Sequence, residues 1–207
     1  MNHGAGDYLL LVGRVAPEKG IAEAIEVARR SGRRLVVAAK VYDPKEQQMF
    51  DKLVQPAIDE GVVDWRGEVD AAQRDELMAG ALATLMLGAW PEPFGLVAIE
   101  SMATGTPVIA RRAGANTETI QHGSSGYLID DIDEALLAVA KVPTLNRRQV
   151  AAYARGRFST ERMVSEYEQA YAMVMAAKPA PQTVLIDQAP TGRLRVIDPA
   201  DELDEPA

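Results

Sequence analysis

The sequence predicts an α/β fold in which helices cover both faces of a parallel sheet. Short apolar runs alternate with amphipathic stretches along most of the 207 residues. The runs are continuously apolar, which is typical of strands that are buried on both faces. Because crossovers between parallel strands are right-handed, this order predicts a doubly wound, Rossmann-like domain.

Strands are expected at residues 8–12, 35–39, 62–65, 83–87, 107–111 and 127–129. Helices are expected at 21–30, within 45–60, and at 71–79, 96–103 and 132–139. In the first helix the apolar residues Ile21, Ala24, Ile25 and Ala28 recur with helical spacing and predict a buried face. Two extra helices, at 147–157 and 160–176, are expected to follow the sheet.

The composition changes after Lys178. We expect one Rossmann-like domain over residues 1–178 and a Pro-rich, acidic tail over 179–207 that is mostly disordered. The tail has six acidic and two basic residues, so its net charge of -4 is half of the total of -8. Two similar segments in it, 183–187 and 194–198, are expected either to pair as a small hairpin or to dock on another protein.

Several function classes are excluded by composition. An acidic body lacks the electrostatic footprint of a nucleic-acid-binding protein. No run approaches the roughly 20 apolar residues of a membrane span, and residues 1–7 lack the apolar run of a signal peptide. We therefore expect no integral membrane segment and a cytoplasmic location, with membrane association only through a further domain.

Metal and nucleophilic chemistry have few candidate residues. The absence of cysteine, with only His3 and His122 as histidines, removes the usual zinc sites and any Cys-His pair. His122 lies in a turn-like stretch, which favours a loop histidine over a member of a Ser-His-Asp triad. Asp131 and Asp133 resemble a metal-binding Asp-x-Asp, but their place at a helix start favours N-capping by Asp131. No metal is expected.

The loop after the first predicted strand combines two cations with two glycines. Arg14 and Lys19 lie between Gly13 and Gly20, and Pro17 stiffens the chain between them. The helix that starts after Gly20 adds a positive dipole, so a diphosphate could be bound here. The loop is not a Walker phosphate loop, because it lacks Gly-x4-Gly-Lys-Ser/Thr. A solvated basic turn is the alternative.

A second loop holds a carboxylate on a rigid backbone. Pro91 and Pro93 keep the chain out of the helical region around Glu92, and Gly95 allows close approach to a ligand. Glu100 follows early in the next helix, where it could face the same cleft or be an ordinary helix carboxylate. The free amides at the start of that helix suit a phosphate or a sugar hydroxyl, and they belong to Gly95, Leu96 and Val97.

Two further loops fall at the same edge of the predicted sheet. Gly114 and a possible Asn116 cap could place another helix N-terminus near the cleft. Lys40 and Tyr42, after the second strand, either contact a nucleotide or cover the strand end.

Taken in order, these motifs closely resemble glycosyltransferase family four. The matching elements are Gly-Arg-x4-Lys-Gly, the Glu-x7-Glu from Glu92 to Glu100, the segment 103–110, the segment 123–129, and the helix start at 157–159. The resemblance covers residues 8 to 176 and implies the C-terminal, donor-binding half of a two-domain GT-B fold.

The resemblance also implies roles for single residues. Arg14 and Lys19 would clamp the donor diphosphate and stabilise it as it leaves. Glu92 would face the donor sugar, as nucleophile or as stabiliser of an oxocarbenium-like state, and Glu100 would hold the ribose hydroxyls. The turn 66–69, ending at Val69, would contact the base. Backbone amides around Phe94, Gly95, Leu96 and Val97 would contact sugar and phosphate.

The implied reaction is sugar transfer from a nucleoside diphosphate, most simply a UDP- or GDP-sugar, with retention of configuration and without a cofactor or metal. Such enzymes close two domains over a cleft, so an N-terminal acceptor domain is expected in cis or as a separate subunit. The chain alone is expected to be inactive. The alternative function is a non-catalytic nucleotide-sugar-binding or regulatory module.

Overall fold

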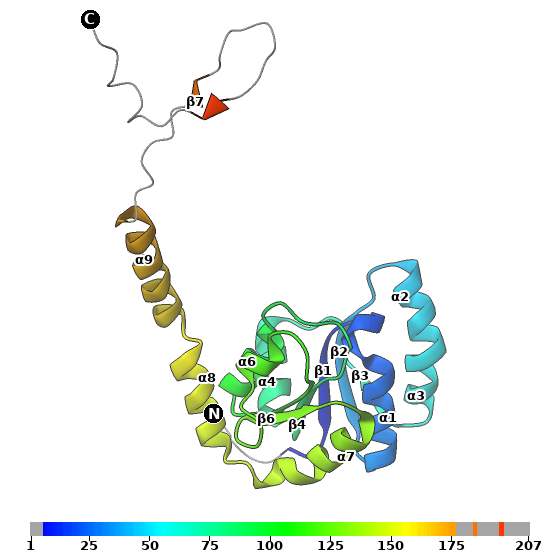
Figure 1. The fold of residues 1–207 in the computed structure, drawn as a ribbon. Coiled ribbons are helices and arrows are strands. Elements are labelled where there is room, and N and C mark those ends of the chain that lie inside the picture. Colours follow the sequence, from blue (N-terminus) through cyan, green and yellow to red (C-terminus); the bar gives the residue numbers. More distant parts are fainter. Residues whose placement is uncertain (1–5, 177–183, 186–194, 197–207) are drawn as a thin grey trace, which may run out of the picture. The chain divides into compact units, whose positions relative to one another are not determined.

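The structure is a computed structural model that describes residues 6–176 and two short strands, β7 (Val184–Leu185) and β8 (Arg195–Val196) (Figure 1). The chain divides into two compact units, one that ends at Ser159 and one that begins at Thr160. Within the described residues, no helix is long and apolar enough to cross a membrane.

Six parallel strands form one sheet in the order β3-β2-β1-β4-β5-β6. The chain runs outward from β1 to β3 and then returns to the other side of β1 with β4. This confirms the doubly wound arrangement, and it puts the crevice where ligands bind outside the carboxyl ends of β1 and β4. The strands are β1 (Leu9–Arg14), β2 (Leu35–Lys40), β3 (Val63–Trp65), β4 (Ala83–Met86), β5 (Val108–Arg111) and β6 (Gly126–Ile129).

Helices cover both faces of this sheet, and α1 packs beside α7 on one of them (Figure 1). The helices of the first unit are α1 (Ile21–Ser31), α2 (Pro44–Met49), α3 (Gln55–Asp59), α4 (Ala71–Gly80), α5 (Leu96–Ala103), α6 (Asn116–Thr119), α7 (Ile132–Lys141) and α8 (Arg147–Arg157). The second unit begins with α9 (Thr160–Ala176). Single helical turns occur at Pro17–Lys19 and Val142–Thr144.

Alternate residues of β1 pack into cores on opposite faces of the sheet. Leu9 and Leu11 pack with Ile21 of α1, whereas Leu10 packs with Met78 of α4. All five side chains are at most 1% exposed. The continuous apolar runs therefore have the physical cause inferred from the sequence, which is burial on both sides. A third cluster joins β5 to α5 and α8.

Two elements differ from expectation. β1 extends past Val12 to Arg14, because Gly13 and Arg14 stay in register with Ala39 and Lys40 of β2. Arg14 is thus the last residue of a strand and not part of the loop. The helix expected within 45–60 is continuous, but it widens into a π-helical segment at Phe50–Val54. Pro56 follows directly and cannot donate to a residue one turn earlier, which favours such a local change.

The carboxyl end of α4 is fixed by two side chains from elsewhere in the chain. Arg147 donates to the carbonyls of Ala81 at 2.8 Å and Ala79 at 3.1 Å, and also to the Thr106 hydroxyl. Burial lowers the pKa of the Arg147 guanidinium below its usual value. The Tyr8 hydroxyl donates to the Leu77 carbonyl at 2.7 Å, and burial raises its pKa above the usual 10.0.

Three smaller expectations can also be compared with the structure. Asp131 is the N-cap of α7 and accepts the Glu134 amide at 2.8 Å, as predicted. His122 is a loop histidine whose Nδ1 accepts the Leu128 amide at 3.1 Å. β7 and β8 pair antiparallel, which is the hairpin alternative. The rest of the tail 179–207, for which disorder was predicted, lies outside the described residues.

Candidate functional site at the carboxyl edge of the sheet

The loops that follow β1 and β4 are in direct backbone contact. The turn Pro17–Lys19 ends at Gly20, which has φ 70° and ψ 34° and caps α1. A Cβ atom at Gly20 would lie 2.3 Å from the Gly88 nitrogen, and one at Gly88 would lie 1.8 Å from the Glu18 carbonyl oxygen. No side chain fits between the two loops, so glycine is required at both positions.

This contact brings Lys19 and Glu92 together. The Lys19 ammonium donates to Glu92 Oε1, and the two side chains are 31% and 21% exposed. The backbone of Glu92 is held from the other side, where its carbonyl accepts the Ala115 amide at 2.9 Å. Two residues that were predicted on separate loops thus form one ion pair.

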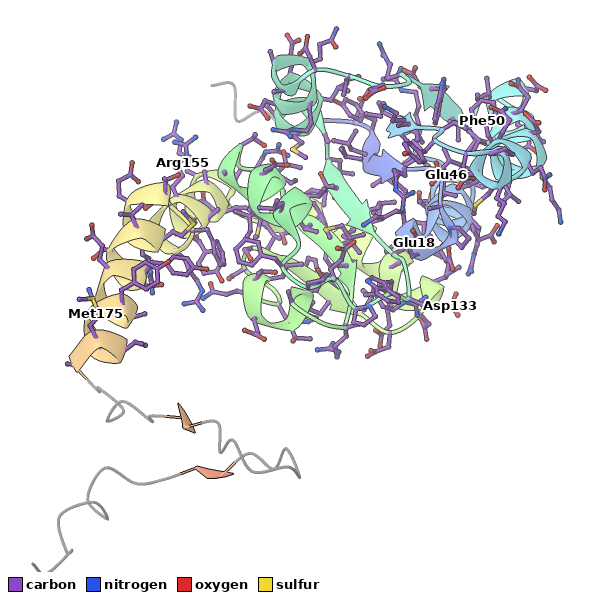
Figure 2. The ribbon with its side chains drawn as sticks, turned by 90° about the horizontal axis from the view of Figure 1, so that it is seen from above. Glu18, Glu46, Phe50, Asp133, Arg155 and Met175 are labelled. Carbon is purple, nitrogen blue, oxygen red and sulfur yellow. The ribbon has the colours of Figure 1, made fainter. Side chains whose placement is uncertain are left out.

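Arg14 faces two other carboxylates. Its guanidinium donates to Glu46 Oε1 at 2.6 Å and to Glu18 Oε1 at 3.0 Å. Both glutamates are labelled in Figure 2 and come from different elements. Glu18 belongs to the turn Pro17–Lys19, and Glu46 belongs to α2. Glu46 is only 5% exposed, and its second oxygen accepts the Tyr42 amide at 2.7 Å. Arg14 is therefore oriented by a buried carboxylate that is itself fully bonded.

The start of α5 provides unused donors at the same edge. Gly95 has φ 77° and ψ 49° and caps the helix without a side-chain hydrogen bond. Its carbonyl accepts the amides of Ala98 and Ile99, so the amides of Leu96 and Val97 precede the helical ladder. Three large apolar side chains surround this point and are more than half exposed, namely Trp90, Phe94 and Leu96.

The remaining predicted residues lie on neighbouring elements. Glu100 forms an ion pair with Arg74 of α4 at 3.1 Å and does not contact the Lys19–Glu92 pair. Val69 is half-buried at the end of the turn after β3. That turn is joined to β2 by the ion pair between Lys40 and Glu68 at 3.1 Å. Lys40 thus covers the strand end, while Tyr42 is 72% exposed.

A small cavity of about 30 Å³ opens between the β1 and β4 loops and α5. Its lining includes the charged residues Glu18, Lys19 and Glu92, the apolar residues Met86 and Val97, and Asn116. Asn116 is 2% exposed and is the first residue of α6; Ala115, not Asn116, is the N-cap. The prediction that Asn116 is the N-cap is therefore wrong. Its side-chain nitrogen instead donates to the Arg111 carbonyl at 3.0 Å.

Three residues of this site were missed or misplaced by sequence reasoning. Glu46 and Arg74 lie in helices, where the sequence pattern does not distinguish them from other charged residues. Asn116 was considered only as a cap. The partners of Glu46 and Arg74, which are Arg14 and Glu100, are distant in the chain, so local patterns carry no signal for these pairs. Within the described residues, no group of three or more His, Cys, Asp or Glu side chains could hold a metal ion.

The family model described as glycosyl transferases group 1 matches residues 3–157. Among curated proteins, the chain is 34% identical over 146 residues to D-inositol 3-phosphate glycosyltransferase of Acidothermus cellulolyticus, which covers 65% of the chain and 32% of the relative. It is 31% identical over 163 residues to glycogen synthase of Mycobacterium tuberculosis, covering 77% and 39% respectively. The chain thus spans about a third of the length of these relatives.

Solved structures show the same fold. The crystal structure of AviGT4, a glycosyltransferase involved in Avilamycin A biosynthesis, matches with a TM-score of 0.71 and 27% identity, over 86% of this chain and 54% of that one. Anabaena HepE in complex with UDP and glucose matches with a TM-score of 0.65 and 24% identity, over 83% and 49%. The parallel sheet described above is the Rossmann-like half of the GT-B fold, and the chain shares this fold with both structures. The chain belongs to the glycosyl transferases group 1 family.

Proposed function

We propose that this domain binds a nucleoside-diphosphate sugar and forms the donor half of a retaining glycosyltransferase. The observation that carries the proposal is the meeting of Lys19, Glu92 and the start of α5 at one cavity beside the switch point of the sheet. Cation, carboxylate and free amides are the groups that a diphosphate joined to a sugar requires.

The diphosphate would be bound by positive groups from three elements. Arg14 ends β1, Lys19 precedes α1, and the amides of Leu96 and Val97 begin α5. When the bond to the sugar breaks, negative charge develops on the leaving diphosphate. Fixed cations and amides stabilise that charge without having to reorganise, which lowers the barrier.

The sugar and the ribose would be met by the two glutamates. Glu92 lies at the cavity next to Lys19, where a carboxylate stabilises the positive charge that develops at the anomeric carbon. Glu100 lies about one turn into α5 and would accept hydrogen bonds from the two ribose hydroxyls, as carboxylates do. No metal or organic cofactor takes part in this proposal.

Transfer would also need an acceptor site, which we place on a partner domain in cis or on a separate subunit. The exposed side chains of Trp90, Phe94 and Leu96 support this part of the proposal, because they offer an apolar rim that a closing domain can cover. The coverage of only about a third of the curated relatives agrees with it.

The proposal is tested by calorimetric titration of the chain with UDP, GDP and ADP. One of them should bind with a Kd between about 1 µM and 1 mM. The affinity should be weak because this chain forms only one side of the cleft. Lys19→Ala should weaken that binding. Lys141→Ala, a matched change at the last residue of α7, should leave it unchanged. Absence of binding by all three nucleotides at millimolar concentration would refute the proposal.

A further inference from the structure

Asn116 carries a buried acceptor that has no partner. Within the described residues, its Oδ1 atom is buried and makes no hydrogen bond. The other end of the carboxamide is fixed, because its nitrogen donates to the Arg111 carbonyl at 3.0 Å. The oxygen therefore cannot exchange places with the nitrogen without losing that bond. Most buried polar atoms in proteins are paired, so an unpaired one points to a group that is supplied from outside.

The Asn116 side chain borders the cavity next to the start of α5. Asn116 lines the cavity together with Glu92 and Val97. A Cβ atom at Gly95 would lie 3.5 Å from Asn116 Oδ1, which places this oxygen next to the turn that begins α5. The volume of about 30 Å³ accommodates a group the size of a hydroxyl or a water molecule.

The neighbours of this oxygen determine which ligand atom suits it. A carboxamide oxygen accepts hydrogen bonds and repels phosphate oxygens, which are acceptors too. Glu92, on the same cavity, is also an acceptor and carries negative charge. The combination excludes a phosphate oxygen next to Asn116 and favours an uncharged hydroxyl donor.

We propose that Asn116 is a specificity-determining residue whose Oδ1 accepts a hydrogen bond from one hydroxyl of the transferred sugar. The inference rests on the proposed function and deepens it. It assigns the part of the cavity next to Asn116 to the sugar, and it requires a donor sugar with a free hydroxyl that enters this part. A sugar that lacks this hydroxyl leaves the acceptor unpaired and binds more weakly.

The test compares the nucleoside diphosphate that binds the chain with its glucose adduct and the four monodeoxy analogues of that adduct. Asn116→Ala should weaken binding of the glucose adduct about three- to tenfold and change binding of the diphosphate itself less than twofold. One deoxy analogue should bind the parent protein about three- to tenfold more weakly than the glucose adduct does. Asn116→Ala should bind that analogue and the glucose adduct equally. That analogue identifies the hydroxyl.

Thr119→Val is the matched control for structural damage. Thr119 is on the same helix, is 4% exposed, and its hydroxyl donates to the Ala115 carbonyl at 2.9 Å. The variant should lower the melting temperature and leave the preference between diphosphate and adduct unchanged. An equal change of this preference in both variants, or no change in Asn116→Ala, would overturn the assignment while the proposed function stands. Absence of binding of every nucleotide by the parent would overturn both.

Discussion

Replacing Lys19 by alanine and Glu92 by glutamine should change nucleotide affinity in opposite directions. The two side chains form an ion pair across the cavity, so each controls what the other can do. A diphosphate has to compete with Glu92 for the Lys19 ammonium. Lys19→Ala removes the cation, whereas Glu92→Gln releases it and removes a negative charge close to the phosphates.

The magnitudes follow from this competition. A unit charge at about 4 Å from a phosphate oxygen contributes roughly 4 kcal/mol at an effective dielectric constant of about 20. Releasing Lys19 from a partly exposed carboxylate costs about 1 kcal/mol, and desolvation reduces the gain further. The net loss in Lys19→Ala is therefore about 1–3 kcal/mol, or a five- to hundredfold weaker Kd. Glu92→Gln should bind the diphosphate about two- to fivefold more tightly.

Calorimetric titration of both variants with the nucleoside diphosphate measures these changes, and thermal melts check that the fold is retained. Glu92→Gln should nevertheless bind the sugar adduct no better than the parent does, because Glu92 is assigned to the sugar. Its main deficit should be in turnover once an acceptor domain is present, since the role proposed for Glu92 is to stabilise the transition state. If both variants weaken the binding of the diphosphate equally, Lys19 and Glu92 do not compete with it and the reasoning fails.

Three further predictions concern other parts of the domain. Glu100→Ala should weaken binding of the diphosphate itself about three- to tenfold, because Glu100 is assigned to the ribose, and an unchanged Kd in titration would contradict that role. Arg147→Met should lower the free energy of unfolding by about 2–4 kcal/mol in urea titrations, because two carbonyls at the end of α4 and the Thr106 hydroxyl lose their donor; a loss below about 1 kcal/mol would mean that water replaces it. Burial raises the pKa of Tyr8, so the folded protein keeps a proton that the unfolded chain releases, and stability should fall as the pH rises above 10.0. Tyr8→Phe should show a smaller fall in unfolding titrations at pH 9 and pH 11, and an identical fall would exclude Tyr8 as its cause.

The helices that have strong end signals were predictable from the sequence. α5 begins and ends as expected, because Pro93 and Gly95 prevent an earlier start. The bounds of α8 and α9 also agree with the prediction. β1 was predicted two residues short, because Gly13 reads as a turn signal, and pairing with β2 overrides that local preference.

The candidate site was predictable in its residue types but not in its pairings. Arg14 and Lys19 looked like equivalent cations of one loop, yet the structure pairs one with Glu46 and the other with Glu92. The partner of Arg14 comes from a helix 32 residues away, and only the parallel pairing of β1 with β2 brings that helix near. Such partners depend on tertiary contacts, for which a single sequence carries no local pattern.

The contact between Gly20 and Gly88 has a consequence for how donor preference can change in evolution. Because no methyl group fits between these backbones, the loop that carries Lys19 and the chain that leads to Glu92 behave as one rigid frame. Little conformational entropy is then lost at Lys19 and Glu92 when a ligand binds, because the two loops that carry them are already ordered in the folded protein. An insertion in either loop would move Lys19 away from Glu92. New donor preferences should therefore arise from side-chain replacements around an unchanged backbone.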